Sequence, residues 1–111
     1  MKVERQKVGT VDVIRPVGPL IDQDVAPFAD ALMERIHASN PRVVVAMVDV
    51  PYMDSVALER LLDATDELSD RAMNLKLAAV TPACREILEL TGLASKFSLF
   101  ADVQDAVRSF L

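Results

Sequence analysis

The chain joins a long apolar run to an amphipathic pattern in the stretch "RVVVAMVDVPYMDSVALERLL", residues 42–62. The run "VVVAMV" at 43–48 has no charged residue, which is typical of a strand buried on both faces of a largely parallel sheet. Apolar residues recur at helical spacing after Ser55. Between the two patterns, Asp54 and Ser55 place a carboxylate and a hydroxyl where a strand gives way to a helix. The stretch therefore predicts a β-α unit.

The segments on either side predict more units of the same kind. Gly9 and Thr10 are suited to a turn between two short strands, Pro16 predicts that the second strand ends there or lies at a sheet edge, and Asn40-Pro41 stops the first helix. The predicted strands span residues 2–8, 11–17, 42–50, 75–80 and 96–100, and the predicted helices span about 22–39, 55–72, 82–91 and 103–110.

Helix-end signals and apolar stripes accompany these segments. Asp22, Thr81 and Asp102 are predicted to cap helices, and Gly92 is predicted to end the third one. The helix after Ser55 has a predicted inward stripe of Leu58, Leu61, Leu62, Thr65, Leu68 and Ala72. Its polar face consists of Glu59, Arg60, Asp63, Asp66, Glu67 and Asp70. The predicted stripe of the third helix is Ala83, Ile87 and Leu90 or Thr91, and that of the last helix is Val103, Ala106, Val107 and Phe110.

The resulting order is β-β-α-β-α-β-α-β-α. Strands that alternate with helices indicate an α/β fold with a mostly parallel sheet. We predict a small open mixed sheet of four or five strands with about four helices, one antiparallel edge, and a single domain over residues 1–111.

Composition excludes several classes of function. The net charge of −5 argues against nucleic acid and against an anionic membrane surface as partners. The single cysteine, Cys84, cannot form an internal disulfide, which fits a reducing cytosol. The N-terminal stretch has no apolar core of a signal peptide, and the longest apolar run is far too short to span a membrane. We therefore expect a cytoplasmic protein without direct membrane insertion.

Signatures of enzymes and metal sites are missing. The chain has three glycines and no glycine-rich phosphate loop, and its one histidine, His37, is predicted at the helix end opposite Ser55. His37 is interpreted as a solvent-facing or dipole-compensating residue. Cys84 is interpreted as a small residue of the third helix, with a reactive thiol as the lesser alternative. We expect no catalytic residue, metal or cofactor, and a turnover that depends on His37 or Cys84 would revive the enzyme hypothesis.

Two interpretations of Asp54-Ser55 remain open from the residues alone. The pair lies at a strand end and a helix start, where outward backbone N–H groups favour an anion. The simpler interpretation is a helix cap, which typically contributes about 1 kcal/mol. On these grounds the cap has the greater weight.

The chain resembles the STAS family, the anti-sigma factor antagonist domains, most clearly from "RVVVAMVDVPYMDSVALERLL" through "NLKLAAVTPACREILELTGLASKFSLFADVQDAV". The family shows a buried strand, a hydrophobic-Asp-Ser-Ser-Gly-Leu turn, a helix, and later a Pro-led helix ending in "LTGL". The matching residues are Asp49, Met53, Asp54, Ser55, Leu58, Pro82, Leu88, Leu90, Thr91, Gly92, Leu93, Phe97 and Ala106. The resemblance covers the last two-thirds of the chain clearly and the first third in predicted topology.

The resemblance implies a phosphorylation switch at Ser55. By this resemblance the unphosphorylated domain binds an anti-sigma factor with serine kinase activity and frees a sigma factor for transcription in a bacterial cytoplasm. Phosphorylation releases the complex, and a serine phosphatase resets it. The implied phosphoacceptor turn is Met53, Asp54, Ser55 and Val56. The implied partner-binding surface is Asp22, Asp54, Ser55, Val56, Glu59, Arg60 and Asp63.

One departure from the family pattern supports an alternative. Val56-Ala57 replaces the usual Ser-Gly, which removes backbone freedom and adds a branched apolar side chain. The alternative is a STAS docking protein that is not phosphorylated, such as a stress-sensing scaffold or a subunit of a lipid-transport ATPase. In that case Asp54 and Ser55 are caps and the acidic helix face binds the partner. We expect a monomer or weak dimer, and no nucleotide site is predicted.

Overall fold

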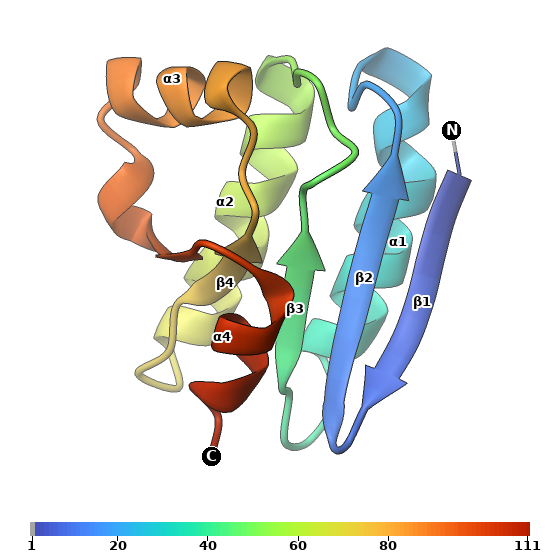
Figure 1. Ribbon diagram of the computed structural model, residues 1–111, viewed down its shortest axis with the longest axis vertical. Helices are drawn as coiled ribbons and strands as arrows, with labels where there is room; N and C mark the ends of the chain where they lie inside the picture. The colour runs from blue at the N-terminus through green and yellow to red at the C-terminus, as the bar shows by residue number, and fades with distance from the viewer. Residues whose placement is uncertain (1) are drawn as a thin grey trace.

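The computed structural model describes residues 2–111 and shows a five-stranded sheet in the order β1-β2-β3-β4-β5 (Figure 1). The strands are β1 (Lys2–Val8), β2 (Val11–Val17), β3 (Val43–Ala46), β4 (Leu75–Ala78) and β5 (Phe97–Phe100). The α-helices are α1 (Val25–Ile36), α2 (Ser55–Ser69), α3 (Pro82–Leu90) and α4 (Val103–Arg108), and short 3-10 helices span Asp22–Asp24 and Ala94–Lys96. The predicted order of strands and helices is confirmed.

The sheet combines one antiparallel pair with three parallel pairs. β1 and β2 form an antiparallel hairpin that turns at Gly9, where φ is +62°. β2, β3, β4 and β5 are then parallel neighbours, and all four residues of β3 are buried, as predicted for a central strand. The parallel strands therefore deliver their carboxyl ends to one edge of the sheet, where the helices begin.

Of the two alternatives predicted from Pro16, the strand end is correct to within one residue and the edge position is wrong. β2 continues to Val17 and lies between β1 and β3, so it is not an edge strand. Its ladder with β3 pairs Asp12–Ile14 with residues 43–45, and Pro16 lies beyond that ladder. A proline is tolerated at this point because β3 needs no N–H donor from it.

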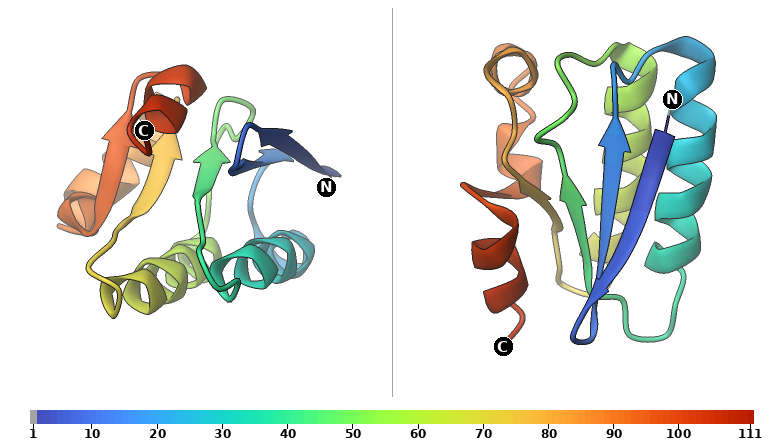
Figure 2. Two further views of the ribbon diagram at one scale, coloured as in Figure 1. Left: turned by 90° about the horizontal axis from the view of Figure 1, so that it is seen from below. Right: turned by 45° about the vertical axis from the view of Figure 1, so that its right-hand side comes forward.

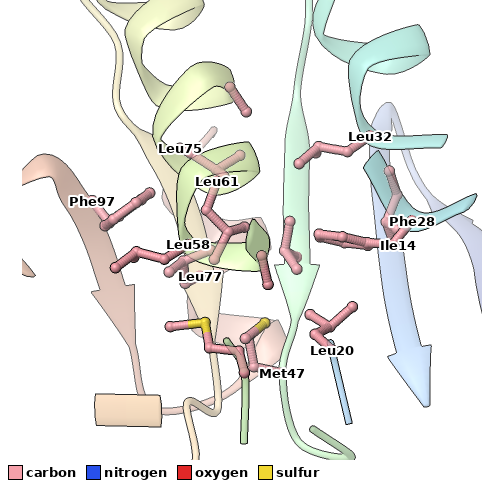
Figure 3. Packing of buried hydrophobic residues seen from close by; sticks show 14 of the residues in the cluster. Ile14, Leu20, Phe28, Leu32, Met47, Leu58, Leu61, Leu75, Leu77 and Phe97 are labelled. Carbon is pink, nitrogen blue, oxygen red and sulfur yellow. The ribbon is translucent and has the colours of Figure 1, made fainter. Parts of the chain in front are cut away.

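The two faces of the sheet are covered unequally. Helices α1 and α2 lie side by side on one face, and the short α4 lies on the other (Figure 2). The larger core fills the space between the sheet and the α1–α2 layer (Figure 3). It includes Ile14, Phe28, Leu32, Leu61 and Leu77. The smaller core, under α4, consists of Val11, Val13, Val44, Ala46, Ala78 and Ala106.

Most predicted helix faces are confirmed, with two exceptions. Ala72 is exposed because α2 ends at Ser69 and Ala72 has a left-handed backbone with φ of +59°. In α3 the buried residues are Cys84 and Leu88, whereas Ala83, Leu90 and Thr91 are exposed. The third helix therefore packs through the neighbouring stripe, and only Ile87 of the predicted one is partly buried.

The predicted helix ends are confirmed in part. Asp102 caps α4 by accepting a hydrogen bond from the Asp105 N–H at 2.8 Å, and Gly92 ends α3 with φ of +72°. Thr81 precedes α3, but its hydroxyl donates to the Val50 carbonyl at 2.7 Å instead of capping the helix. Asp22 does not cap α1 either, because the 3-10 turn of residues 22–24 lies before that helix. Helix α1 ends at Ile36, earlier than the Asn40-Pro41 stop.

Candidate functional site

The predicted phosphoacceptor turn lies at the carboxyl edge of the sheet, where two loops run side by side. Leu20, after β2, forms an isolated parallel bridge with Met53, before α2. The Leu20 N–H donates to the Tyr52 carbonyl at 3.1 Å, and the Asp54 N–H donates to the Leu20 carbonyl at 3.0 Å. Both Leu20 and Met53 are buried. The turn is therefore anchored to the core directly before Ser55.

The Asp54 carboxylate joins the starts of two helical segments. Oδ1 accepts a hydrogen bond from the Ala57 N–H at 3.0 Å, which caps α2. Oδ2 accepts a hydrogen bond from the Asp22 N–H at 2.8 Å, which fixes the 3-10 turn before α1. Asp22 has a left-handed backbone with φ of +48°, so the contact holds an unusual conformation for a non-glycine residue. Asp54 is thus both a local cap and a long-range clamp.

These contacts also fix the charge of Asp54. The backbone N–H groups of Asp22 and Ala57 stabilise the carboxylate and lower the pKa of Asp54 below its ordinary value. The side chain is therefore ionised at neutral pH. A negative charge therefore stands beside Ser55.

Ser55 is the first residue of α2, and its side chain is exposed. Within residues 2–111 its hydroxyl has no hydrogen-bond partner, because the capping role belongs to Asp54. Of the two side chains of the Asp54-Ser55 pair, one is committed to the fold and the other is free. The hydroxyl is therefore exposed at the start of a 15-residue helix, where backbone N–H groups favour an anion.

The replacement of Ser-Gly by Val56-Ala57 leaves the turn unstrained. Ala57 is fully buried, its N–H bonds to Asp54, and it is not among the residues with positive φ. The backbone at this position therefore does not need glycine. Val56 points its side chain to the surface and is 41% exposed. The departure therefore changes the surface beside Ser55 and requires no positive φ at Ala57.

The predicted partner-binding surface is continuous along α2. Val56, Glu59 and Asp63 are exposed at helical spacing from the Ser55 end. Arg60 is half-buried between two acidic side chains, with its guanidinium 3.6 Å from Glu59 Oε1 and 3.4 Å from Asp63 Oδ2. Met53, by contrast, is buried and acts as an anchor of the turn.

Two exposed apolar side chains near the turn were not predicted as site residues. Tyr52 is 47% exposed and Val48 is 51% exposed. Both lie in the segment between β3 and α2, and an aromatic residue directly before the Met53-Asp54-Ser55 turn was the available signal in the sequence. Six large hydrophobic side chains are exposed within residues 2–111, and three of them, Val48, Tyr52 and Val56, lie between the end of β3 and the first turn of α2.

The two other reactive side chains do not belong to this site. His37 follows the end of α1, at the opposite end of the sheet from the start of α2 (Figure 1), and its Nε2 lies 3.2 Å from Glu67 Oε2. It is exposed, as predicted, and cannot act as a base for Ser55. Cys84 is buried, and burial raises the pKa of its thiol. No group of three potential metal ligands occurs within residues 2–111.

No helix in the described part of the chain is long and apolar enough to cross a membrane. This finding concerns residues 2–111 only.

Comparisons with known proteins agree on the fold. An anti-sigma factor antagonist from Mycobacterium paratuberculosis is 26% identical, with a TM-score of 0.83, covering 97% of this chain and 92% of that one. The Bacillus cell fate determinant SpoIIAA, in its phosphorylated form, is 20% identical with a TM-score of 0.76, covering 99% and 100%. A sulfate transporter family protein from Wolinella succinogenes is 18% identical with a TM-score of 0.71, covering 89% and 83%.

The search of curated protein sequences gives no significant match. The STAS domain profile, however, matches residues 2–106, which is nearly the whole length of the sequence. With this match and the five-stranded fold, the chain belongs to the STAS domain family.

Proposed function

We propose that this protein is an anti-sigma factor antagonist that is switched by phosphorylation of Ser55. The unphosphorylated form binds an anti-sigma factor with serine kinase activity and so releases a sigma factor in the bacterial cytoplasm. Phosphorylation dissociates the complex, and a serine phosphatase restores the binding form. The 111 residues act as one domain that accepts phosphate and catalyses no reaction itself.

The observation that carries the proposal is the division of roles between Asp54 and Ser55. Asp54 holds the turn through two backbone N–H groups, and the Ser55 hydroxyl is exposed and unbonded. A kinase therefore meets a rigid turn that presents a free nucleophile. Phosphorylation requires no rupture of the cap and leaves the fold intact.

Electrostatics explains how the phosphate would act as a switch. A phosphoserine carries about −1.5 to −2 charges at pH 7. The backbone N–H groups at the start of α2 stabilise that charge, so the modified protein stays folded. Because Asp54 is already ionised, the surface around Ser55 becomes densely negative. A partner that packs against the bare serine then meets both added bulk and repulsion.

The chemistry of the partner surface follows from the same residues. Tyr52 and Val56 offer apolar contacts next to Ser55, and aromatic side chains frequently anchor protein interfaces. The exposed face of α2 adds acidic side chains at Glu59 and Asp63. The partner is therefore expected to carry an apolar pocket with a basic rim.

Binding of two charge variants tests the proposal. Ser55→Ala should bind a serine kinase of the anti-sigma class in the presence of ATP without being released. Ser55→Asp should bind weakly, because it adds a negative charge at the interface. Ser39→Asp is the matched control, since Ser39 is exposed in the loop after α1, at the other end of the fold. Equal affinity of Ser55→Ala and Ser55→Asp for the kinase would overturn the switch.

A second candidate function is docking without phosphorylation, as a scaffold or a transporter-associated STAS domain. Val56 favours it, because a branched apolar side chain stands where the family pattern has serine, directly beside the acceptor hydroxyl. The fold likeness to a sulfate transporter family protein is consistent with such a role. In this case Val56→Ser should weaken partner binding, whereas Ser55→Ala and Ser55→Asp should bind alike.

A further inference from the structure

A basic cavity lies between the edge strand β1 and helix α1, away from the Ser55 turn. Its volume is about 220 Å³. It is lined by Arg5, Gln6 and Lys7 of β1, by Asp12, Val13 and Ile14 of β2, and by Arg35 of α1. Helix α1 begins at the Ser55 edge of the sheet, and Arg35 lies in its last turn (Figure 1). The cavity is therefore at a different end of the helical layer from the proposed switch.

The two arginines reach the cavity from different elements. Arg5 pairs with Ile14 across the β1–β2 hairpin, so the two side chains share a face of the sheet. Ile14 belongs to the core beneath α1, which places Arg5 on the α1 side of β1. Arg35 comes from α1 and is half-buried. Strand and helix thus direct two guanidinium groups towards one small space.

Neither guanidinium group is neutralised within residues 2–111. Arg5 and Arg35 form no hydrogen bond or ion pair through their side chains with any described residue. The carboxylate that lines the same cavity, Asp12, lies 3.4 Å from Lys7 Nζ and balances that charge instead. Two arginine side chains without an ion-pair partner among residues 2–111 therefore line the same cavity, in a protein whose net charge is −5. Arg35 is half-buried and Arg5 is exposed, so an anion in the cavity would stabilise the Arg35 guanidinium group most.

The helix dipole accounts for only part of this arrangement. A basic side chain in the last turn of a helix is stabilised by the carbonyl end of the dipole, which explains a cation at Arg35. It does not explain Arg5, which lies on another element and should be repelled by Arg35. An anion bound in the cavity would offset this repulsion.

We propose that the Arg5–Arg35 cavity binds a small oxyanion of the phosphate class. Guanidinium groups present planar sets of donors that match phosphate oxygens in a bidentate manner, and two of them can hold a multiply charged group. The volume admits a phosphate or pyrophosphate group. This site is independent of the proposed function of Ser55.

Titration calorimetry with inorganic pyrophosphate tests the proposal, using the whole chain at constant ionic strength. Pyrophosphate should bind the unmodified protein, and Arg5→Gln or Arg35→Gln should weaken binding about tenfold or more, since each removes a charge-assisted contact. Arg35→Lys should restore binding only in part, because lysine keeps the charge and loses the fork of donors. Citrate should bind more weakly than pyrophosphate.

The matched control is Arg85→Gln, which removes one positive charge from an exposed arginine on α3. It should leave pyrophosphate affinity unchanged. An NMR titration of the unmodified protein adds a test that needs no variant. The changes in backbone amide chemical shift caused by pyrophosphate should centre on residues 5–7 and 35. The proposal is overturned if pyrophosphate does not bind, if Arg85→Gln weakens binding as much as Arg35→Gln, or if citrate binds as tightly.

Discussion

Helices α2 and α4 both begin after an aspartate, and the two caps differ in what else they hold. Asp54 accepts from the Ala57 N–H at 3.0 Å, and Asp102 accepts from the Asp105 N–H at 2.8 Å, so the local capping bond is the same. Asp54 also accepts a hydrogen bond from the backbone N–H of Asp22, which lies 32 positions earlier in the chain. The residue that follows is an exposed serine in α2 and the half-buried Val103 in α4.

The comparison separates capping from the presentation of a functional group. At α4 the cap only starts a short helix whose apolar side chains cover the sheet. At α2 the cap also ties together the loops after β2 and β3, and the hydroxyl of the serine that follows has no partner within residues 2–111. A long-range clamp therefore distinguishes the serine turn from an ordinary helix start.

The largest expected effect comes from removing each carboxylate in turn. Asp54→Ala loses a local bond and a long-range bond, and Asp102→Ala loses a local bond only, so Asp54→Ala should lower the free energy of unfolding more. Urea unfolding of both variants measures the difference. Equal losses would show that the contact with Asp22 contributes nothing to stability.

The clamp should also give stability a specific dependence on pH. Because the pKa of Asp54 is lowered in the folded state, its contribution is fully present above the unfolded pKa of about 3.9 and is lost as pH falls through the folded pKa. Asp54→Asn still offers a cap oxygen but carries no charge. The stability difference between the unmodified protein and Asp54→Asn should be constant above about pH 5 and shrink in more acidic solution. A difference that grew towards low pH would contradict this assignment.

The smallest effect is expected at Ser55 itself. Its hydroxyl has no partner among the described residues, so Ser55→Ala should change the free energy of unfolding by less than about 0.5 kcal/mol. Thermal unfolding provides the measurement. A clear loss of stability would mean that Ser55 shares the capping role, as the docking alternative assumed.

The sequence was sufficient for the order of elements because each signal was local. The charge-free run at 43–48, the turn at Gly9 and the cap at Asp102 each depend on a few neighbouring residues. The buried face of the third helix could not be predicted in this way, because within "PACREILEL" the stripes at 83/87 and 84/88 are equally apolar. Which stripe faces inward depends on the docking of α3, and the structure buries Cys84 and Leu88.

The positions of the candidate site residues could be predicted from the sequence, but the long-range hydrogen bond that holds them could not. The residues of the turn follow from the resemblance to the STAS family, whereas the bond from the Asp22 N–H to Asp54 joins segments far apart in the chain. From its neighbours in the sequence alone, Asp22 is predicted to be a helix cap. The left-handed conformation of Asp22 has no local sequence signal such as glycine, because the clamp itself holds it.

Intact-mass spectrometry tests the central claim, that the clamped turn presents Ser55 as a phosphate acceptor. The protein is incubated with ATP and an active serine kinase of the anti-sigma class, and Ser55→Ala and Ser39→Ala are treated in parallel. We expect the mass of one phosphate on the unmodified protein and on Ser39→Ala, and none on Ser55→Ala. No added phosphate, with the kinase shown to be active on another substrate, or a phosphate retained in Ser55→Ala, would contradict the claim.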